Sequence, residues 1–590
     1  MSARRERGRP AAQETIPSVA GWRRLASFLG PEEEQWGSLL LLALGVGVLS
    51  GASAVGLRSA VHALFHGLAP LRDGWLGPLL PAFGAALGAA IVLQLFREPP
   101  GHGVPEVIRA VCRDGGRMRR RSIFSRWLGS LCNVASGGSA GLESPIVFSA
   151  AAIGSTVGGW LQLDERRRTL LLACGVAGGI SAVFNAPMTG MIFAMEVVLA
   201  EWSAFAIVPV VMSAVAATEL SRIVLGDAQS ILHAPFDMGA RDLLACALLG
   251  IVAGLVSAVF TRTIALFQGL AARIRGHRIL APALFGLLVG VIGIVAPGAI
   301  GEGYDTARAA IHSELAPGLL FCALLVFAKL VTTGLTIGSG APGGVFAPCL
   351  VLGSLLGVGF SRVLGVLLPD TLSLSVEGSY ALVAMSGLVA GVMQAPLTGI
   401  FLVMEVTDGY EVILPLMIVS VLSLVVKRRF DRYSMYTHEL AESGDLLRPG
   451  TDRRILADVS VRETLDQDVT PISEDMTLLD FAEVLKTSHR NHFPVLRSGS
   501  DEFAGMLELA PIREILLDPE MARVTLVGTM MDSDTPTIPL EASLAEALSL
   551  FEQTGAWALP VVDGRRFSGL LSKSSLFDHY RRELSVQAPR

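Results

Sequence analysis

Charged residues are scarce in this chain. Lys, Arg, Asp and Glu together make up 17% of its 590 residues, whereas a soluble globular domain carries about 25%. Hydrophobic residues make up 51%, and the mean hydropathy is +0.55. This composition excludes a protein whose whole surface is solvated by water, and it indicates that part of the chain lies in a membrane.

Sequence signals of enzymes and of metal sites are also missing. The sequence has no HExxH motif, P-loop or nucleophile elbow, so we expect no enzyme activity, no cofactor and no bound metal. A divalent-cation transporter would need clustered carboxylates, and the acidic residues inside the apolar runs are isolated. The cysteines lie singly, with no CxxC spacing, which favours core packing of Cys112, Cys132, Cys174, Cys246, Cys322 and Cys349.

Apolar runs fill the chain up to about residue 427, and the remainder has the composition of a soluble protein. Some runs reach the roughly 20 residues that cross a bilayer, while others are shorter and are broken by Gly and Pro. This pattern predicts tilted and discontinuous membrane helices. The runs that are almost free of charge are 38–57, 77–96, 243–260, 280–296, 317–328 and 378–405.

The topology follows from clusters of basic residues. Residues 117–121, 166–168 and 427–429 are rich in Arg and Lys, and cytoplasmic loops carry such an excess. The first 30 residues are polar, without the apolar core of a signal peptide. We therefore expect a multi-pass protein of the cell (plasma or inner) membrane with both termini in the cytoplasm.

The membrane part contains an internal repeat. Residues 186–197 read APMTGMIFAMEV and residues 395–406 read APLTGIFLVMEV, with seven identities in twelve positions. Repeats of this kind are typical of transporters whose site lies between two halves. Glu196 and Glu405 take equivalent places in the repeat, which favours a structural role for both.

The soluble tail also contains a repeat. A short strand-like run and an amphipathic helix precede FPVL (493–496) in one copy and LPVV (559–562) in the other, and GML or GLL follows. This arrangement resembles a pair of CBS domains, which implies a tandem of α/β modules.

The resemblance also bears on nucleotide binding. In CBS pairs that bind nucleotides, Ser or Thr is followed three residues later by Asp. Here the corresponding pairs are Glu508 with Pro511 and Ser572 with Ser575. We therefore expect weak or no nucleotide binding and a mainly structural tail.

Three Gly-rich segments interrupt the apolar runs. They are GHGVP (101–105), GGSAGLESP (137–145) and GSGAPGGVFAP (338–348). Gly permits unusual dihedrals and Pro is tolerated in a first helical turn, so each segment can begin a helix inside the membrane. Helix N-termini that converge would bind a small anion without holding it too tightly. The alternative is that the small residues only allow close packing of helices.

These segments, in this order, make the sequence similar to the CLC family of chloride channels and chloride/proton exchangers, with the signatures GSGIP, GREGP and GGIFAP. The resemblance covers about residues 36–585. It implies an all-α polytopic membrane domain of two inverted-topology halves, built from broken, tilted helices, and a cytoplasmic α/β CBS tandem. It also implies a homodimer in which each subunit has its own anion pathway.

The expected domains follow from this resemblance. They are a cytoplasmic N-terminal tail (1–35), the anion-transport domain (36–430), a linker (431–453) and two CBS domains (454–520 and 521–590).

The resemblance assigns the site residues. Glu143 matches the gating glutamate, whose carboxylate can occupy an anion position and block it, and a carboxylate inside a membrane segment is costly and usually functional. Tyr433 matches a tyrosine that contacts the anion, although it could also be an interfacial anchor. Arg126 falls where the family has a basic residue behind the pathway. The expected anion site comprises His102, Gly103, Gly141, Leu142, Gly344, Val345, Phe346, Ala347 and Tyr433, with the backbone N–H groups of Val345 and Phe346 facing the ion.

Three positions depart from the family pattern. His102 replaces a serine that contacts chloride, and its imidazole can either donate an N–H to the anion or turn to the backbone. Leu142 and Ser144 replace a basic residue and a glycine beside Glu143. Val197 replaces the glutamate that relays protons in exchangers, as in the channel members.

The substitution at Val197 decides the expected mechanism. We expect passive transport of chloride or similar small anions, gated by Glu143. The alternative is a chloride/proton antiporter with a non-standard relay, such as Glu196 or Glu201. The expected partners are the anion, the lipid bilayer and a second copy of the chain, and nothing indicates nucleic acid.

Overall fold

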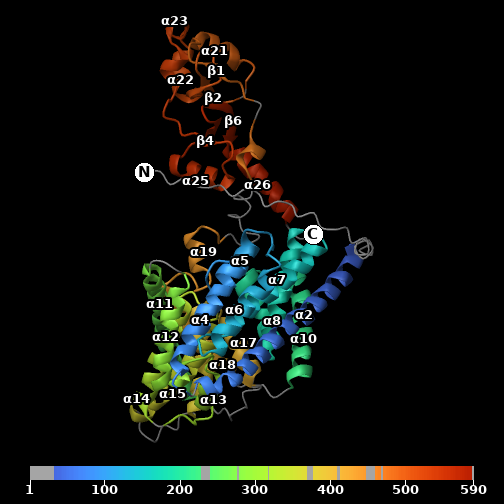
Figure 1. The fold of residues 1–590 in the computed structure, drawn as a ribbon. Helices are drawn as coiled ribbons and strands as arrows, with labels where there is room; N and C mark the ends of the chain where they lie inside the picture. Colours follow the sequence, from blue (N-terminus) through green and yellow to red (C-terminus); the bar gives the residue numbers. More distant parts are fainter. Residues whose placement is uncertain are drawn as a thin grey trace. The chain divides into compact units, whose positions relative to one another are not determined.

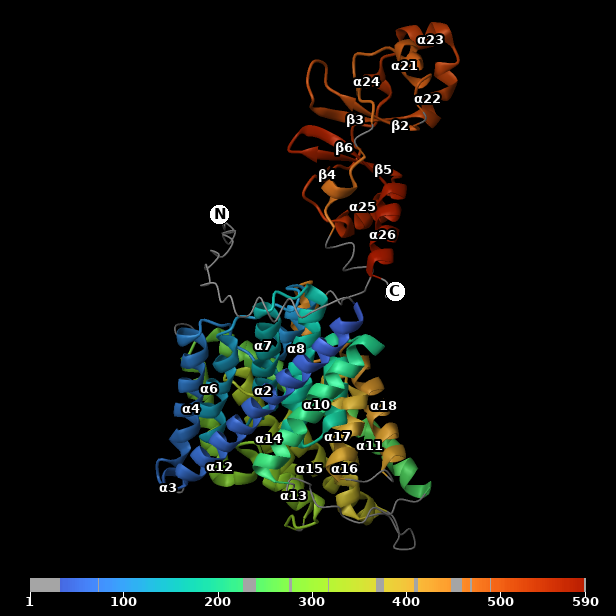
Figure 2. The ribbon, with the colours of Figure 1, turned by 90° about the vertical axis from the view of Figure 1, so that its right-hand side faces the viewer.

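The computed structural model forms two compact units, Met1–Leu446 and Leu447–Arg590 (Figures 1 and 2). It describes residues 32–72, 74–226, 240–274, 278–316, 318–367, 376–407, 412–446, 459–466, 469–488 and 490–587. Residues 1–31 of the predicted N-terminal tail and residues 447–453 of the predicted linker lie outside these ranges.

The first unit consists of helices. Those before residue 230 are α2 (Glu32–Gly67), α3 (Ala69–Arg72), η1 (Gly77–Leu79), α4 (Leu80–Ala90), η2 (Ile91–Leu95), α5 (Val104–Cys112), α6 (Ser122–Ala135), α7 (Glu143–Trp160), α8 (Glu165–Phe184), α9 (Pro187–Phe193), η3 (Ala194–Leu199) and α10 (Ala204–Leu225). The later ones are α11 (Ala240–Arg273), α12 (Leu280–Val295), η4 (Pro297–Ala299), α13 (Tyr304–Ile311), α14 (Leu319–Gly338), α15 (Phe346–Leu367), α16 (Glu377–Met393), α17 (Pro396–Thr407), α18 (Ile413–Phe430) and α19 (His438–Glu442).

The lengths of these helices fit a membrane-spanning domain. Within the described residues, seven helical segments are long and apolar enough to cross a bilayer, and several apolar helices are shorter. The seven are Gly37–Gly67, Gly77–Leu95, Glu165–Phe184, Ala204–Leu225, Asp242–Arg273, Leu319–Gly338 and Phe346–Leu367. The prediction of a multi-pass helical domain with discontinuous helices is therefore confirmed.

The Gly-Pro segments begin helices, as predicted. Gly103 is the N-cap of α5 and has a φ of 94°, a left-handed conformation that favours glycine. Pro105, Pro145 and Pro348 lie in the first turns of α5, α7 and α15, where a residue without an N–H leaves no hydrogen bond unmade.

The small residues also bring helices close together. A Cβ atom on Gly47 of α2 would lie 2.3 Å from the backbone oxygen of Ser213 in α10, and one on Gly154 of α7 would lie 2.0 Å from the backbone oxygen of Leu171 in α8. In Figure 2, α2 and α10 run obliquely, side by side. Initiation of helices and close packing therefore occur together in this unit.

The two halves of the unit cap each other's helices. The Glu196 carboxylate accepts hydrogen bonds from the backbone N–H groups of Leu397 (3.1 Å) and Thr398 (2.8 Å) and from the Thr398 hydroxyl (2.7 Å) at the start of α17. The Glu405 carboxylate accepts the equivalent three bonds from Met188 and Thr189 at the start of α9, at 2.9, 2.7 and 2.6 Å. Both carboxylates therefore have the structural role predicted from their symmetry.

The second unit consists of two modules of the same topology. The first contains β1 (Ile472–Ser473), α21 (Leu478–Leu485), β2 (His492–Leu496), β3 (Phe503–Glu508), α22 (Leu509–Leu516), α23 (Pro519–Val524) and α24 (Val527–Met530). The second contains β4 (Ile538–Pro539), α25 (Leu544–Thr554), β5 (Ala558–Asp563), β6 (Arg566–Ser572) and α26 (Lys573–Gln587), and η5 (Val461–Thr464) precedes both.

Sheet pairing repeats from one module to the other. In each module the first strand pairs parallel with the second, and the second pairs antiparallel with the third. The register shifts at equivalent points, between Val495 and Leu496 and between Val561 and Val562. The predicted doubled α/β module is therefore confirmed.

The edges of the domains differ from the predicted boundaries. Val461 packs in the core of the second module and Val527 in the core of the first. The core of each module therefore includes a residue from the other side of the predicted boundary between residues 520 and 521. The membrane unit extends to Leu446 and not to 430, because Tyr436 and Leu440 pack in its core. Sequence patterns located the repeated strands, but not these exchanged segments.

Candidate anion site

Two Gly-rich loops meet at the centre of the membrane unit. The backbone N–H of Gly141 donates to the oxygen of Gly344 at 2.8 Å, and the N–H of Gly344 donates to the oxygen of Gly141 at 2.7 Å. These bonds bring together the first residues of α7, at Glu143, and of α15, at Phe346. Two helix N-termini therefore converge at one buried place, where free N–H groups favour negative charge.

Glu143 lies at this meeting point. Its side chain is 1% exposed, and its Oε1 accepts a hydrogen bond of 2.6 Å from the Tyr304 hydroxyl. Its Oε2 has no hydrogen-bond partner in the described part of the chain, although the backbone N–H groups of Glu143 and Ala347 stabilise its charge. The carboxylate thus occupies a place suited to an anion.

Gly141 and Ala347 of the expected anion site lie beside the Glu143 carboxylate. Leu142, Val345, Phe346 and Ala347 are all buried. The Phe346 ring packs on Phe184 at 5.1 Å and on Phe193 at 6.3 Å between ring centres. This packing fixes the first turn of α15, so the orientation of its free N–H groups is fixed as well.

His102 reaches the site from another direction. The residue is 8% exposed, and its Nδ1 has no hydrogen-bond partner among the described residues. Its ring packs edge-on against Tyr436, with 5.6 Å between ring centres. Tyr436 is 1% exposed and close enough to Ser144 and Glu143 to interact with them electrostatically.

The expected tyrosine is not part of this group. Tyr433 is 36% exposed, and its backbone N–H donates to Asp431. Sequence reasoning missed Tyr436, although DRYSMY contains both tyrosines. Only the turn between α18 and α19 decides which of them points inward.

Arg126 lies behind His102. It is 1% exposed, and its Nη2 donates to the backbone oxygen of Pro99 at 2.6 Å and to Glu106 Oε1 at 3.0 Å. Its Nε and Nη1 make no hydrogen bond to any described residue. Two nitrogens of the guanidinium are therefore without a hydrogen bond among the described residues, close to the loop that carries His102.

The three basic clusters lie on the side from which His102 approaches. Arg113, at the end of α5, pairs with Asp445 at 3.0 Å, which links this end to the segment after α18. Gly116 lies against Thr169 in the first turns of α8, since a Cβ atom on Gly116 would lie 2.8 Å from the backbone nitrogen of Thr169. We refer to this side of the unit as the basic side.

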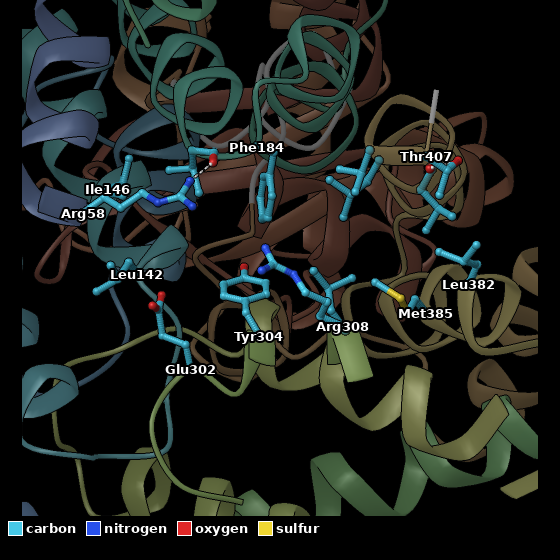
Figure 3. A pocket seen from close by; sticks show the side chains of 15 residues that line it. Arg58, Leu142, Ile146, Phe184, Glu302, Tyr304, Arg308, Leu382, Met385 and Thr407 are labelled. Atoms are coloured by element: carbon cyan, nitrogen blue, oxygen red, sulfur yellow. Dashed lines mark hydrogen bonds between the residues drawn. The ribbon is translucent and has the colours of Figure 1, made fainter. Parts of the chain in front are cut away.

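A cavity of about 120 Å³ lies on the opposite side of Glu143. Its polar lining includes Arg58 of α2, Glu302 before α13, and Tyr304 and Arg308 of α13, whose side chains reach into it from two directions in Figure 3. Arg58 also donates to the backbone oxygen of Val183 at 3.0 Å. Val183 lies in the last turn of α8, a helix of 20 residues whose first turn contains the basic cluster at 166–168, about 30 Å away.

Comparison with known proteins identifies the family. A family model described as voltage gated chloride channel matches residues 83–428, and a CBS domain model matches residues 527–582. The chain belongs to the voltage gated chloride channel family.

Relatives within this family carry two kinds of name. A chloride channel protein, ClcB-like, of Ralstonia nicotianae is 31% identical and aligns over 69% of this chain and 97% of its own. An H(+)/Cl(-) exchange transporter, ClcA, of Vibrio cholerae serotype O1 is 32% identical over 68% of this chain and 89% of its own.

A solved structure shares the fold. A slow cyanobacterial Cl-/H+ antiporter superimposes with a TM-score of 0.62 at 24% identity, covering 70% of this chain and 99% of its own. The predicted fold class is confirmed by this likeness and by the family models.

The expected passive channel is contradicted. A relative that is 32% identical is named an H(+)/Cl(-) exchange transporter, which overturns the mechanism expected from Val197. A single substituted position does not decide between a channel and an exchanger.

Four residues that line the cavity were not predicted from the sequence: Arg58, Glu302, Tyr304 and Arg308. Arg58 lies in a long apolar helix that shows no motif, whereas GEGYD at 301–305 repeats the Gly-x-Gly pattern of GHGVP. That repeat is the signal that could have found Glu302 and Tyr304. No group of three potential metal ligands occurs in the described residues.

Proposed function

We propose that this protein exchanges chloride for protons across a membrane. The observation that carries the proposal is the buried Glu143 carboxylate, which lies between the N-termini of α7 and α15 with one oxygen unbonded among the described residues. The exchange transporters among its relatives support the same function.

The chemistry of exchange follows from competition at one place. Partial charges at two helix N-termini stabilise either the Glu143 carboxylate or a chloride ion, and both together repel. When Glu143 takes up a proton it loses its attraction to the N–H groups, and chloride can enter. When chloride leaves, the Glu143 carboxylic acid releases its proton and returns to the N–H groups as a carboxylate, so the two ions move in opposite directions.

The proposed anion ligands are backbone groups and two side chains. The N–H groups of Val345, Phe346 and Ala347 would face the ion, together with the backbone of Gly141, Leu142, Gly344 and Gly103. His102 would donate from the basic side, because its Nδ1 makes no hydrogen bond among the described residues. Tyr436 replaces Tyr433 in this proposal because it packs on His102.

The proton requires a group on the basic side. Val197 has no titratable group, and the Glu196 carboxylate already accepts three hydrogen bonds at the start of α17. Glu201 lies just beyond η3 and is exposed. Of the two candidates for a non-standard relay, we therefore favour Glu201.

Orientation, assembly and regulation extend the proposal. The basic side would face the cytoplasm by the positive-inside rule, with both termini there. We propose a homodimer with one pathway in each subunit, as the family resemblance implies. No cofactor is required, and the CBS unit would act mainly as a structural element, because it lacks an acidic ribose partner at Pro511 and Ser575.

Purified protein in liposomes tests this function. A chloride gradient directed outward should drive protons inward, recorded with chloride and pH electrodes together. Glu143→Gln should keep chloride movement and abolish proton movement. Chloride movement in the wild-type protein without proton movement, at every gradient applied, would reject the proposal.

A further inference from the structure

The loops before α5 and α13 are equivalent parts of the two halves. Residues 101–104 read GHGV and residues 301–304 read GEGY. The second glycine of each is the N-cap of the following helix in a left-handed conformation, with a φ of 94° at Gly103 and 87° at Gly303. His102 and Glu302 therefore occupy equivalent positions, one in each half.

The basic residues behind these loops are equivalent too. Arg126 of α6 donates to the backbone oxygen of Pro99, before His102. Lys329 of α14 is fully buried and donates to the backbone oxygens of Ala299, Gly301 and Glu302, at 3.3, 3.0 and 3.3 Å. In both halves a buried cation thus holds the backbone of the loop, which leaves the His102 and Glu302 side chains to face the pathway.

The repeat places these two titratable side chains on opposite sides of Glu143. His102 approaches from the basic side, next to Tyr436. Glu302 lines the cavity on the other side, and Tyr304, which lies two residues later, donates its hydroxyl to Glu143 at 2.6 Å. The Glu302 carboxylate makes no hydrogen bond or ion pair that the described residues record, whereas Glu143 interacts with it electrostatically.

We propose that Glu302 is the outer proton-exchange group of this protein, which passes protons between the external solution and Glu143 through the Tyr304 hydroxyl. This inference rests on the proposed chloride/proton exchange. It assigns a second carboxyl group to the site, on the side away from the basic clusters.

The transfer balances as a relay. A proton from external water binds the Glu302 carboxylate. Tyr304 Oη gives its proton to Glu143 Oε1 and receives one from Glu302, directly or through cavity water, so the tyrosine stays neutral. Glu143 then leaves the N–H groups as a neutral acid, and Glu302 is again a carboxylate. A cavity of about 120 Å³ has room for several water molecules.

The charges around Glu302 suit this exchange. Glu143 and Asp305 are negative and disfavour a second carboxylate, while Arg58 and Lys329 are positive and favour it. Arg308, Tyr304 and Thr407 also belong to the polar lining. Because two carboxylates close together in a poorly hydrated place resist double ionisation, a proton on either one is readily shared with the other.

The test compares Glu302→Gln with Glu314→Gln, an exposed carboxyl just after α13 that does not line the cavity. Both variants and the wild type are placed in liposomes, and the ratio of proton to chloride movement is measured as external pH varies. We expect Glu302→Gln to lower this ratio about a hundredfold, the low end of what a positioned proton-transfer group contributes, while chloride still moves. Glu314→Gln should match the wild type.

Two further variants separate the possible outcomes. Tyr304→Phe removes only the hydroxyl and should lower the ratio like Glu302→Gln, and Glu302→Asp should recover part of it. A wild-type ratio in Glu302→Gln would overturn the assignment of Glu302 and leave exchange intact. A wild-type protein that moves no protons at all would instead reject the proposed exchange. If Glu302→Gln does not fold, a wild-type ratio in Tyr304→Phe overturns the relay.

Discussion

Removing the Glu196 carboxylate should weaken the junction between the two halves without uncoupling transport. In Glu196→Ala, the backbone N–H groups of Leu397 and Thr398 and the Thr398 hydroxyl lose their acceptor. A lost helix cap costs about 0.5–2 kcal/mol, and a hydrogen bond to a charged acceptor contributes about 1.5–3 kcal/mol. Water restores part of this loss because Glu196 is only partly buried, so we expect about 2–3 kcal/mol.

The matched variant is Glu405→Ala. Its carboxylate makes the same three bonds to Met188 and Thr189, at 2.6 to 2.9 Å. The two variants should therefore lose similar amounts of stability, measured as the temperature at which the detergent-solubilised protein ceases to be monodisperse.

Transport distinguishes a cap from a proton relay. Both variants should retain the wild-type ratio of proton to chloride movement in liposomes, even where the amount of folded protein falls. A Glu196→Ala protein as stable as the wild type but without proton movement would refute this reasoning and make Glu196 the relay.

Four further predictions concern the site and the tail. Glu143→Gln should raise chloride flux or remove its pH dependence, and a wild-type pH profile would contradict the gating role. Tyr436→Phe should weaken chloride affinity several-fold by calorimetry, whereas Tyr433→Phe should not; the reverse order would restore Tyr433 to the site. In a Glu143→Gln background, acidification should strengthen chloride binding, and His102→Ser should flatten this pH dependence. Coincident curves of chloride affinity against pH for the two proteins would show that His102 is not a ligand. ATP should show no tight binding to the full chain by calorimetry, and a micromolar dissociation constant would contradict that expectation.

The fold was largely predictable because its signals are local. Gly and Pro determine where α5, α7 and α15 can begin, and these residues are legible in the sequence. The repeat at 186–197 and 395–406 likewise indicated two halves. Gly and Pro act through the backbone of their own segment, so their effect can be predicted without knowing which side chains come into contact in the fold.

The site was predictable only in part, because several of its members depend on tertiary contacts. Tyr433 and Tyr436 are three residues apart, and the sequence gives no reason to bury one and expose the other. Arg58 is one cation in an apolar helix, and its place beside the cavity depends on how α2 crosses α8. Glu302 lacks a following Pro, so GEGYD was not read as the counterpart of GHGVP.

The paired backbone bonds between Gly141 and Gly344 bear on how the protein discriminates between anions. Each loop holds the other at a fixed separation, and the Phe346 ring is locked against Phe184 and Phe193. The separation between the N–H donors of the two loops is therefore nearly constant, and it cannot increase unless these two hydrogen bonds break. An ion too large for this separation could bind only if both hydrogen bonds broke. The backbone alone therefore opposes the binding of large anions, even though large anions lose their hydration water more easily than small ones.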